Sequence, residues 1–147
     1  ESCKIKSRVV SMDEKEKNLR MILNFGHTFG HAFEAAKKFS DKLNHGEAVL
    51  LGMYIASELS FKKKLLSNKD LVLIKKHYNE VNLPKKISSF FKRKDINKII
   101  NFMKKDKKNL NQKINLVLLK RIGKATNSSS IKVKVSEIKK ILNSQLN

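Results

Sequence analysis

Apolar residues recur at helical spacing over most of this chain. The clearest case lies between positions 46 and 66, where Ala48, Leu51, Ile55 and Leu59 follow one another at intervals of three or four. This spacing predicts a long helix that buries one face or is buried entirely. Similar patterns predict helices over about 12–24, 27–39, 67–81, 94–108 and 136–146.

Polar residues indicate where these helices begin and end. Ser11, with Glu14 three residues later, has the form of a capping box for the helix at 12–24. Ser67 or Asn68 and then Ser136 are the predicted N-caps of two later helices, and Gly46 is expected to form a turn. Leu83-Pro84 marks a break.

Two stretches have the composition of strands. Residues 113–123, "KINLVLLKRIG", are rich in β-branched residues and leucine, and residues 130–135, "SIKVKV", alternate between apolar and polar. We expect the two stretches to pair. A short β-branched stretch at 8–10 precedes the first predicted helix. The prediction is a mainly α fold with a minor two-strand element, in a single domain spanning 1–147.

Composition narrows the class of protein. The formal net charge of +20 invites a nucleic-acid-binding interpretation. However, only Arg8, Arg20, Arg93 and Arg121, four of the 33 basic residues, are arginine. Base and phosphate readers favour the planar arginine fork, so we interpret most of the charge as solvated surface. A basic helical nucleic-acid module remains the alternative from another functional class.

Other features suggest a cytoplasmic piece of a larger protein. No apolar run approaches the roughly 18 residues of a membrane span. Cys3 is the single cysteine, which fits a reducing compartment. The chain starts at Glu1 with neither an initiator methionine nor a signal-peptide core. We therefore expect a fragment of a longer cytoplasmic chain.

Three of the four histidines lie within "GHTFGHAFEAAKKFSDKLNHGE". His27 and His31 are four residues apart, which places them on one helix face about 6 Å from each other. His45 could complete a three-ligand metal site. Gly26 and Gly30 are costly inside a helix and indicate a close approach to the backbone. No glutamate follows His27, so the HExxH zinc pattern is absent.

A plainer interpretation of these histidines is equally open. Pairs four residues apart are common on ordinary helix faces, so the spacing alone does not establish a metal site. His77, alone in "IKKHYNEV", is interpreted as a surface helix residue.

A longer pattern carries a family resemblance. The residues "KSRVVSMDEKEKNLRMILNFGHTFGHAFE" followed by "NHGEAVLLGM" resemble the C-terminal, metal- and substrate-binding half of 3-dehydroquinate synthases. The later stretch "MKKDKKNLNQKINLVLLKRIGKA" resembles another segment of that family. Asn18 stands where the family usually has glycine, and asparagine also tolerates the left-handed conformation.

The resemblance implies a reaction and a division of labour. Family members join an N-terminal NAD-binding domain to a largely helical C-terminal domain, and they are commonly homodimers. They convert 3-deoxy-D-arabino-heptulosonate 7-phosphate to 3-dehydroquinate and phosphate in the shikimate pathway. Another sugar phosphate cyclase is the near alternative. Iron-type alcohol dehydrogenases share the architecture but suit a phosphorylated acid less well.

The resemblance also assigns residues. His27 and His45 match two ligands of the family's zinc or cobalt ion, whose third ligand is a glutamate outside this sequence. His31 matches a substrate-contacting residue with a proposed proton-transfer role, and Glu16 a proposed proton acceptor. The remaining matches are substrate contacts: Lys6, Arg20, Asn24 and one of Lys107 and Lys108. As plainer alternatives, Glu16 supports a helix dipole and the two lysines belong to a solvated charge run.

Overall fold

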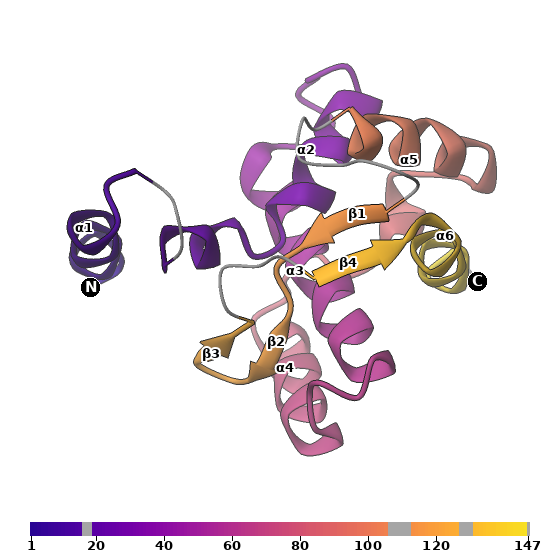
Figure 1. Cartoon of the computed structure of the whole chain (residues 1–147). Coiled ribbons are helices and arrows are strands. Elements are labelled where there is room, and N and C mark those ends of the chain that lie inside the picture. Colours follow the sequence, from indigo (N-terminus) through magenta and orange to yellow (C-terminus); the bar gives the residue numbers. More distant parts are fainter. Residues whose placement is uncertain (16–18, 106–112, 127–130, 147) are drawn as a thin grey trace.

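The computed structural model describes residues 1–15, 19–105, 113–126 and 131–146. The α-helices are α1 (Ser2–Met12), α2 (His27–Ala36), α3 (His45–Lys62), α4 (Asn68–Glu80), α5 (Ile96–Lys104) and α6 (Val135–Ser144). Three 3₁₀ turns are η1 (Leu19–Asn24), η2 (Ile87–Ser89) and η3 (Arg93–Asp95). The strands are β1 (Lys113–Leu116), β2 (Leu119–Arg121), β3 (Lys124–Ala125) and β4 (Ile131–Lys134). The prediction of a mainly α fold with few strands is confirmed (Figure 1).

Helix α3 runs through the centre of the domain. The four residues that predicted it, Ala48, Leu51, Ile55 and Leu59, are all buried. Helices α2, α4 and α6 pack against α3, and α5 packs on α2 and α6; α2, α5 and α6 contribute Phe33, Ile99 and Ile138 among others to one core. The 3.6-residue periodicity of the sequence therefore corresponds to a real buried face.

Helices α2 and α3 are packed against each other through glycines. A Cβ added at Gly52 would lie 2.1 Å from the Gly26 carbonyl oxygen, and one at Gly30 would lie 3.1 Å from Val49 Cα. Gly26 also has a φ of +83° just before α2. The close approach that the glycines predicted is the approach of a neighbouring helix.

The predicted strand pairing is confirmed, with a division that the sequence did not reveal. β1 pairs with β4 in antiparallel register, and the opposed residues Ile114 and Val133 are both fully buried. The rest of the predicted strand turns back at Gly123, where φ is +79°, and β2 pairs with β3. One predicted strand is thus two short strands in two separate pairs.

The prediction for the N-terminal region is wrong. Residues 8–10 lie in α1 rather than in an extended stretch, and α1 ends at Met12 where a helix was expected to begin. Ser11 is not an N-cap, because it lies inside α1 and its hydroxyl donates to the Ser7 carbonyl at 2.9 Å. Asp13 instead accepts the Arg20 backbone N–H at 2.9 Å, and 3₁₀ turns follow at η1.

The helix caps are partly as predicted. Ser67 caps α4 by accepting the Asp70 N–H at 3.1 Å. Ser136 is not a cap, because α6 begins at Val135 and Glu137 accepts the Lys134 N–H. Gly46 does not form a turn; it lies in the first turn of α3, whose N-cap is Asn44. No helix in the described ranges is both long and apolar enough to cross a membrane.

Candidate metal centre

The three clustered histidines converge in space. His27 and His31 lie one turn apart at the start of α2, and His45 is the first residue of α3. The ring centroids are 5.5 Å apart for His27 and His31, 5.8 Å for His27 and His45, and 5.9 Å for His31 and His45. Residues up to 18 positions apart in the sequence therefore face one small volume.

The helix pairing explains this convergence. Along this helix pair, Gly26 lies beside Met53 and Gly30 lies beside Val49. One turn further along α2, Glu34 contacts His45. The two helices therefore run antiparallel, in steps of four residues on each side. Glycines at 26, 30 and 52 let the backbones come close enough for imidazoles on both helices to meet.

Two of the imidazoles are held through Nδ1. His45 Nδ1 lies 3.0 Å from Glu34 Oε2, and His27 Nδ1 lies 3.4 Å from the Phe25 carbonyl oxygen. With the proton on Nδ1, each ring donates to its oxygen and keeps a lone pair on Nε2. This arrangement is typical of metal-binding histidines, whose second nitrogen is oriented by a carboxylate or a carbonyl. Within the described residues, the His31 ring has no corresponding hydrogen bond.

The electrostatics keep His27 neutral. Burial lowers its pKa below the ordinary 6.5, and the nearby His31 and His45 lower it further. The Phe25 carbonyl and Glu34 act in the opposite direction, but the net shift is downward. A neutral imidazole is the form that binds a metal.

A carboxylate that the sequence analysis missed lies in the same place. His31, Glu34 and His45 each offer a ligand atom, and these atoms lie within 4.8 Å of one another. Glu34 has a side chain that is only 13% exposed, and it joins α2 to α3 through His45. The i, i+3 spacing of His31 and Glu34 was a signal that could have found it.

The residues predicted to contact the substrate or accept a proton are less clearly placed relative to the three histidines. Arg20 and Asn24 lie in η1, just before α2, and Arg20 Nη1 donates to the Glu14 carbonyl at 3.1 Å. Lys6 is exposed on α1, which stands away from the rest of the domain in Figure 1, so this structure does not bring Lys6 to the histidines. Glu16, Lys107 and Lys108 lie outside the described residues.

His77 is exposed on α4, as expected for a surface helix residue. It lies at a separate apolar hollow and not beside the other three histidines.

Fold and site together define a helical domain with a candidate metal centre on an antiparallel helix pair. Residues 1–109 match the 3-dehydroquinate synthase C-terminal family, and the chain belongs to that family. It is 58% identical over 123 residues to a 3-dehydroquinate synthase of Pelagibacter ubique (strain HTCC1062), covering 84% of this chain and 33% of the relative. It is 38% identical over 135 residues to that of Nitrobacter hamburgensis, covering 88% and 35%.

Solved structures agree on the fold. A crystal structure of 2-deoxy-scyllo-inosose synthase complexed with carbaglucose-6-phosphate, NAD⁺ and Co²⁺ superposes with a TM-score of 0.76 at 25% identity. The match covers 95% of this chain and 39% of that protein. The chain thus spans about a third of the length of the curated relatives it matches.

Proposed function

We propose that this chain is the metal- and substrate-binding part of a 3-dehydroquinate synthase. The reaction converts 3-deoxy-D-arabino-heptulosonate 7-phosphate to 3-dehydroquinate and phosphate through transient oxidation by NAD, loss of phosphate and an aldol closure. The observation that carries the proposal is the convergence of His27, His31 and His45, with Nδ1 of His27 and of His45 each facing an oxygen acceptor.

His27 and His45 are the proposed ligands of a zinc or cobalt ion. Their Nε2 atoms, which have no hydrogen bond within the described part of the chain, and the lowered pKa of His27 fit a metal-binding role. The bound ion would supply Lewis acidity that polarises a substrate oxygen. The third ligand is proposed to be a glutamate outside these residues. Glu34 is then the carboxylate that orients His45.

His31 is proposed to move a proton instead of binding the metal. Its ring faces the same volume as the two ligands, and a neutral imidazole near pH 7 can accept and return a proton. Arg20 and Asn24 lie in the turn just before His27, which supports a role in holding the substrate's anionic groups. For Lys6, Glu16 and the Lys107–Lys108 pair, the family resemblance is the support.

The cofactor is proposed to be held by another part of the enzyme. NAD is named in the 2-deoxy-scyllo-inosose synthase complex, and this sequence contains five glycines and no glycine-rich nucleotide loop. Homodimer formation and a cytoplasmic location remain predictions from the family. The nucleic-acid alternative predicts binding that falls steeply with salt and is indifferent to the histidines.

A chimeric enzyme tests the proposal. This chain would replace the matching third of the Pelagibacter ubique synthase, and phosphate release from the heptulosonate phosphate would be measured with NAD and Zn²⁺ supplied. We expect sustained turnover that His27→Ala abolishes. A folded chimera that releases phosphate only from a hexose 6-phosphate would favour the cyclase alternative, and one with no turnover would refute both.

A further inference from the structure

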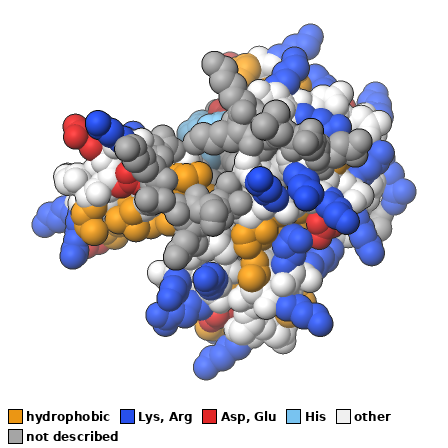
Figure 2. Space-filling view, in the orientation of Figure 1, with side chains coloured by type: hydrophobic (Ala, Val, Ile, Leu, Met, Phe, Trp, Pro, Cys, Tyr) orange, Lys and Arg blue, Asp and Glu red, His pale blue; other side chains and the backbone are white. Residues whose placement is uncertain are grey.

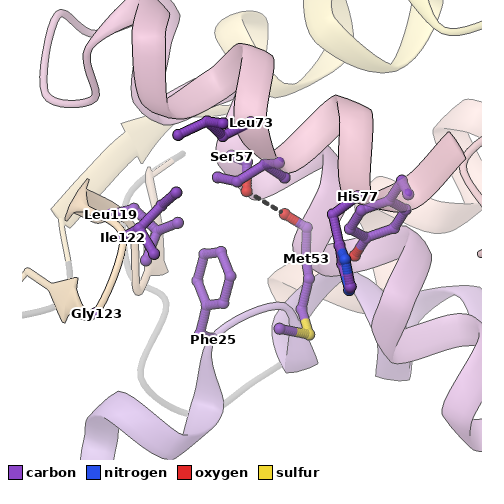
Figure 3. Close-up of a pocket in the computed structure, with 10 residues that line it drawn as sticks. Phe25, Met53, Ser57, Leu73, His77, Leu119, Ile122 and Gly123 are labelled. Carbon is purple, nitrogen blue, oxygen red and sulfur yellow. Dashed lines mark hydrogen bonds between the residues drawn. The ribbon is translucent and has the colours of Figure 1, made fainter. Parts of the chain in front are cut away.

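A hollow of about 380 Å³, which none of His27, His31 and His45 lines, lies between α3, α4 and the β2–β3 hairpin (Figure 3). Phe25 borders it from the segment that leads into α2. Its wall is mostly apolar and includes Phe25, Met53, Leu73, Ile74, Leu119 and Ile122. A volume of this size accommodates two or three large apolar side chains.

Two of the three polar side chains in the wall, Ser57 and Tyr78, are already engaged, which leaves the exposed His77. The Ser57 hydroxyl donates to the Met53 carbonyl at 2.8 Å, and the Tyr78 hydroxyl donates to the Leu50 carbonyl at 2.9 Å. Recognition of a polar metabolite needs convergent, available polar groups. This hollow therefore suits apolar side chains of a protein segment better than a sugar phosphate.

The rim of the hollow exposes apolar side chains to water. Leu73 on α4 is 46% exposed, and Ile122 at the hairpin tip is 50% exposed. Grouped exposed apolar side chains beside a hollow mark a docking surface. Helix α1 has a second such face, where Ile5 is 54% and Met12 is 66% exposed, and apolar side chains are visible along it in Figure 2.

Charge argues against a second copy of this chain as the occupant. Each copy has a net charge of +20, and exposed cations flank the hollow on α4 and the hairpin: Lys69, Lys76, Lys120, Arg121 and Lys124. Two such surfaces repel each other. The complementary partner presents large apolar side chains with acidic residues beside them.

We propose that this hollow receives a segment from the part of 3-dehydroquinate synthase that the relatives have and these 147 residues do not cover. The relatives are about three times as long as the match, so they supply ample chain for the role. The segment buries Leu73 and Ile122 and joins the two parts of the enzyme. This inference rests on the proposed function for the identity of the partner.

The test compares one substitution in two contexts. Leu73→Glu is measured in the isolated 147-residue chain and in the chimeric Pelagibacter ubique synthase. In the isolated chain the side chain of residue 73 is exposed to solvent, so we expect little change in Tm. In the chimera a buried charge should lower Tm by about 2–5 °C. Ile122→Glu on the hairpin should repeat this contrast.

Val72→Glu is the matched control, because Val72 is the neighbouring residue on α4, is 53% exposed and does not line the hollow. It should have little effect in either context. Equal Tm losses for Leu73→Glu in both contexts, or none in either, would overturn the proposal. So would separate unfolding transitions in the chimera, or a self-associated isolated chain that Leu73→Glu dissociates. Turnover is a separate measurement, so failure here is distinguishable from failure of the proposed function.

Discussion

Within the histidine cluster, one hydrogen bond between described side chains joins the two helices, from His45 Nδ1 to Glu34 Oε2. His45 is 58% exposed and begins its helix, so packing alone does not hold its ring. The Glu34 carboxylate supplies the missing constraint and selects the Nδ1-protonated form. The orientation of His45, a proposed ligand, thus depends on Glu34, which is not itself a proposed ligand.

Replacing Glu34 with glutamine should therefore weaken metal binding without unfolding the domain. Neutralising an orienting carboxylate commonly costs 10–100-fold in metal affinity, and we expect a loss of about that size. Competitive Co²⁺ titration of the chimeric enzyme would measure it. Glu80→Gln is the control, since Glu80 pairs with Lys76 on the surface of α4. Equal affinities for both variants would mean that Glu34 does not orient His45.

Replacing His31 should lower turnover alone, whereas replacing His27 should lower both turnover and zinc content. His31→Ala in the chimeric enzyme should lower turnover by about 10²–10⁴-fold, the usual worth of a proton-transfer group, and leave zinc content near normal. His27→Ala should lose both. Metal analysis and phosphate release on the same samples would separate the two effects. A parallel loss of zinc and turnover in His31→Ala would make His31 a ligand.

Between helices, the spacing of α2 and α3 depends on glycine. Gly52→Ala would place a Cβ 2.1 Å from the Gly26 carbonyl oxygen, a contact that neither backbone can relieve cheaply. We expect a destabilisation of about 3 kcal/mol or more, with loss of metal binding as the helices separate. Chemical denaturation would measure it.

Gly46→Ala is the matched control for that substitution. A Cβ at Gly46 meets nothing within 4 Å, and the residue lies in the first turn of α3. Alanine there should stabilise the helix by up to about 0.5–1 kcal/mol. If both alanine variants have the same stability, the glycine contact does not determine the helix spacing.

One ion pair connects α3 to α6 and gives the stability a pH dependence. Lys63 Nζ lies 2.7 Å from Glu137 Oε1, and this hydrogen bond lowers the pKa of Glu137 below its usual 4.5. A lowered folded-state pKa stabilises the protein above the unfolded value, and the contribution is lost as the pH falls through the folded value.

Glu137→Gln should therefore cost about 0.5 kcal/mol at pH 7, a modest amount because the carboxylate is 40% exposed and screened by water. The difference from the unsubstituted chain should shrink as the pH falls below about 4.5. Urea denaturation at several pH values would show this. A difference that is constant from pH 7 to pH 3 would exclude the carboxylate charge as its cause.

Some helices could be predicted from the sequence and others could not, for physical reasons. Helix α3 was predictable because its apolar positions match a fully buried face. Helix α1 was not, because its Val9 and Val10 have strand propensity and the helix packs little against the domain. Local propensity then gave the wrong assignment. Glu34 was missed because its role comes from its contact with His45, a residue of another helix that the tertiary fold brings near.

For the whole molecule, the positive charge should affect stability. The net charge of +20 creates repulsion among lysines that an anionic ligand or an acidic partner would offset. We expect phosphate or sulfate to raise the Tm of the isolated chain more than NaCl of equal ionic strength does. Thermal unfolding in matched buffers would test this. Equal shifts in all three salts would indicate general screening without a specific anion site.

The isolated chain should also be folded yet inactive as a synthase. Its core joins α2, α3, α5 and α6 with the β1–β4 pair, so the residues of this core are buried without the rest of the enzyme. The proposed reaction nevertheless needs a third metal ligand and a bound NAD. Two imidazoles alone should bind zinc weakly, and oxidation cannot start without the cofactor. A coupled assay of phosphate release, with substrate, NAD and Zn²⁺ supplied, should detect nothing above the His27→Ala variant. Sustained turnover above that control would mean that these 147 residues contain both a third ligand and a nucleotide site, and the division of labour proposed for the two parts of the enzyme would be wrong.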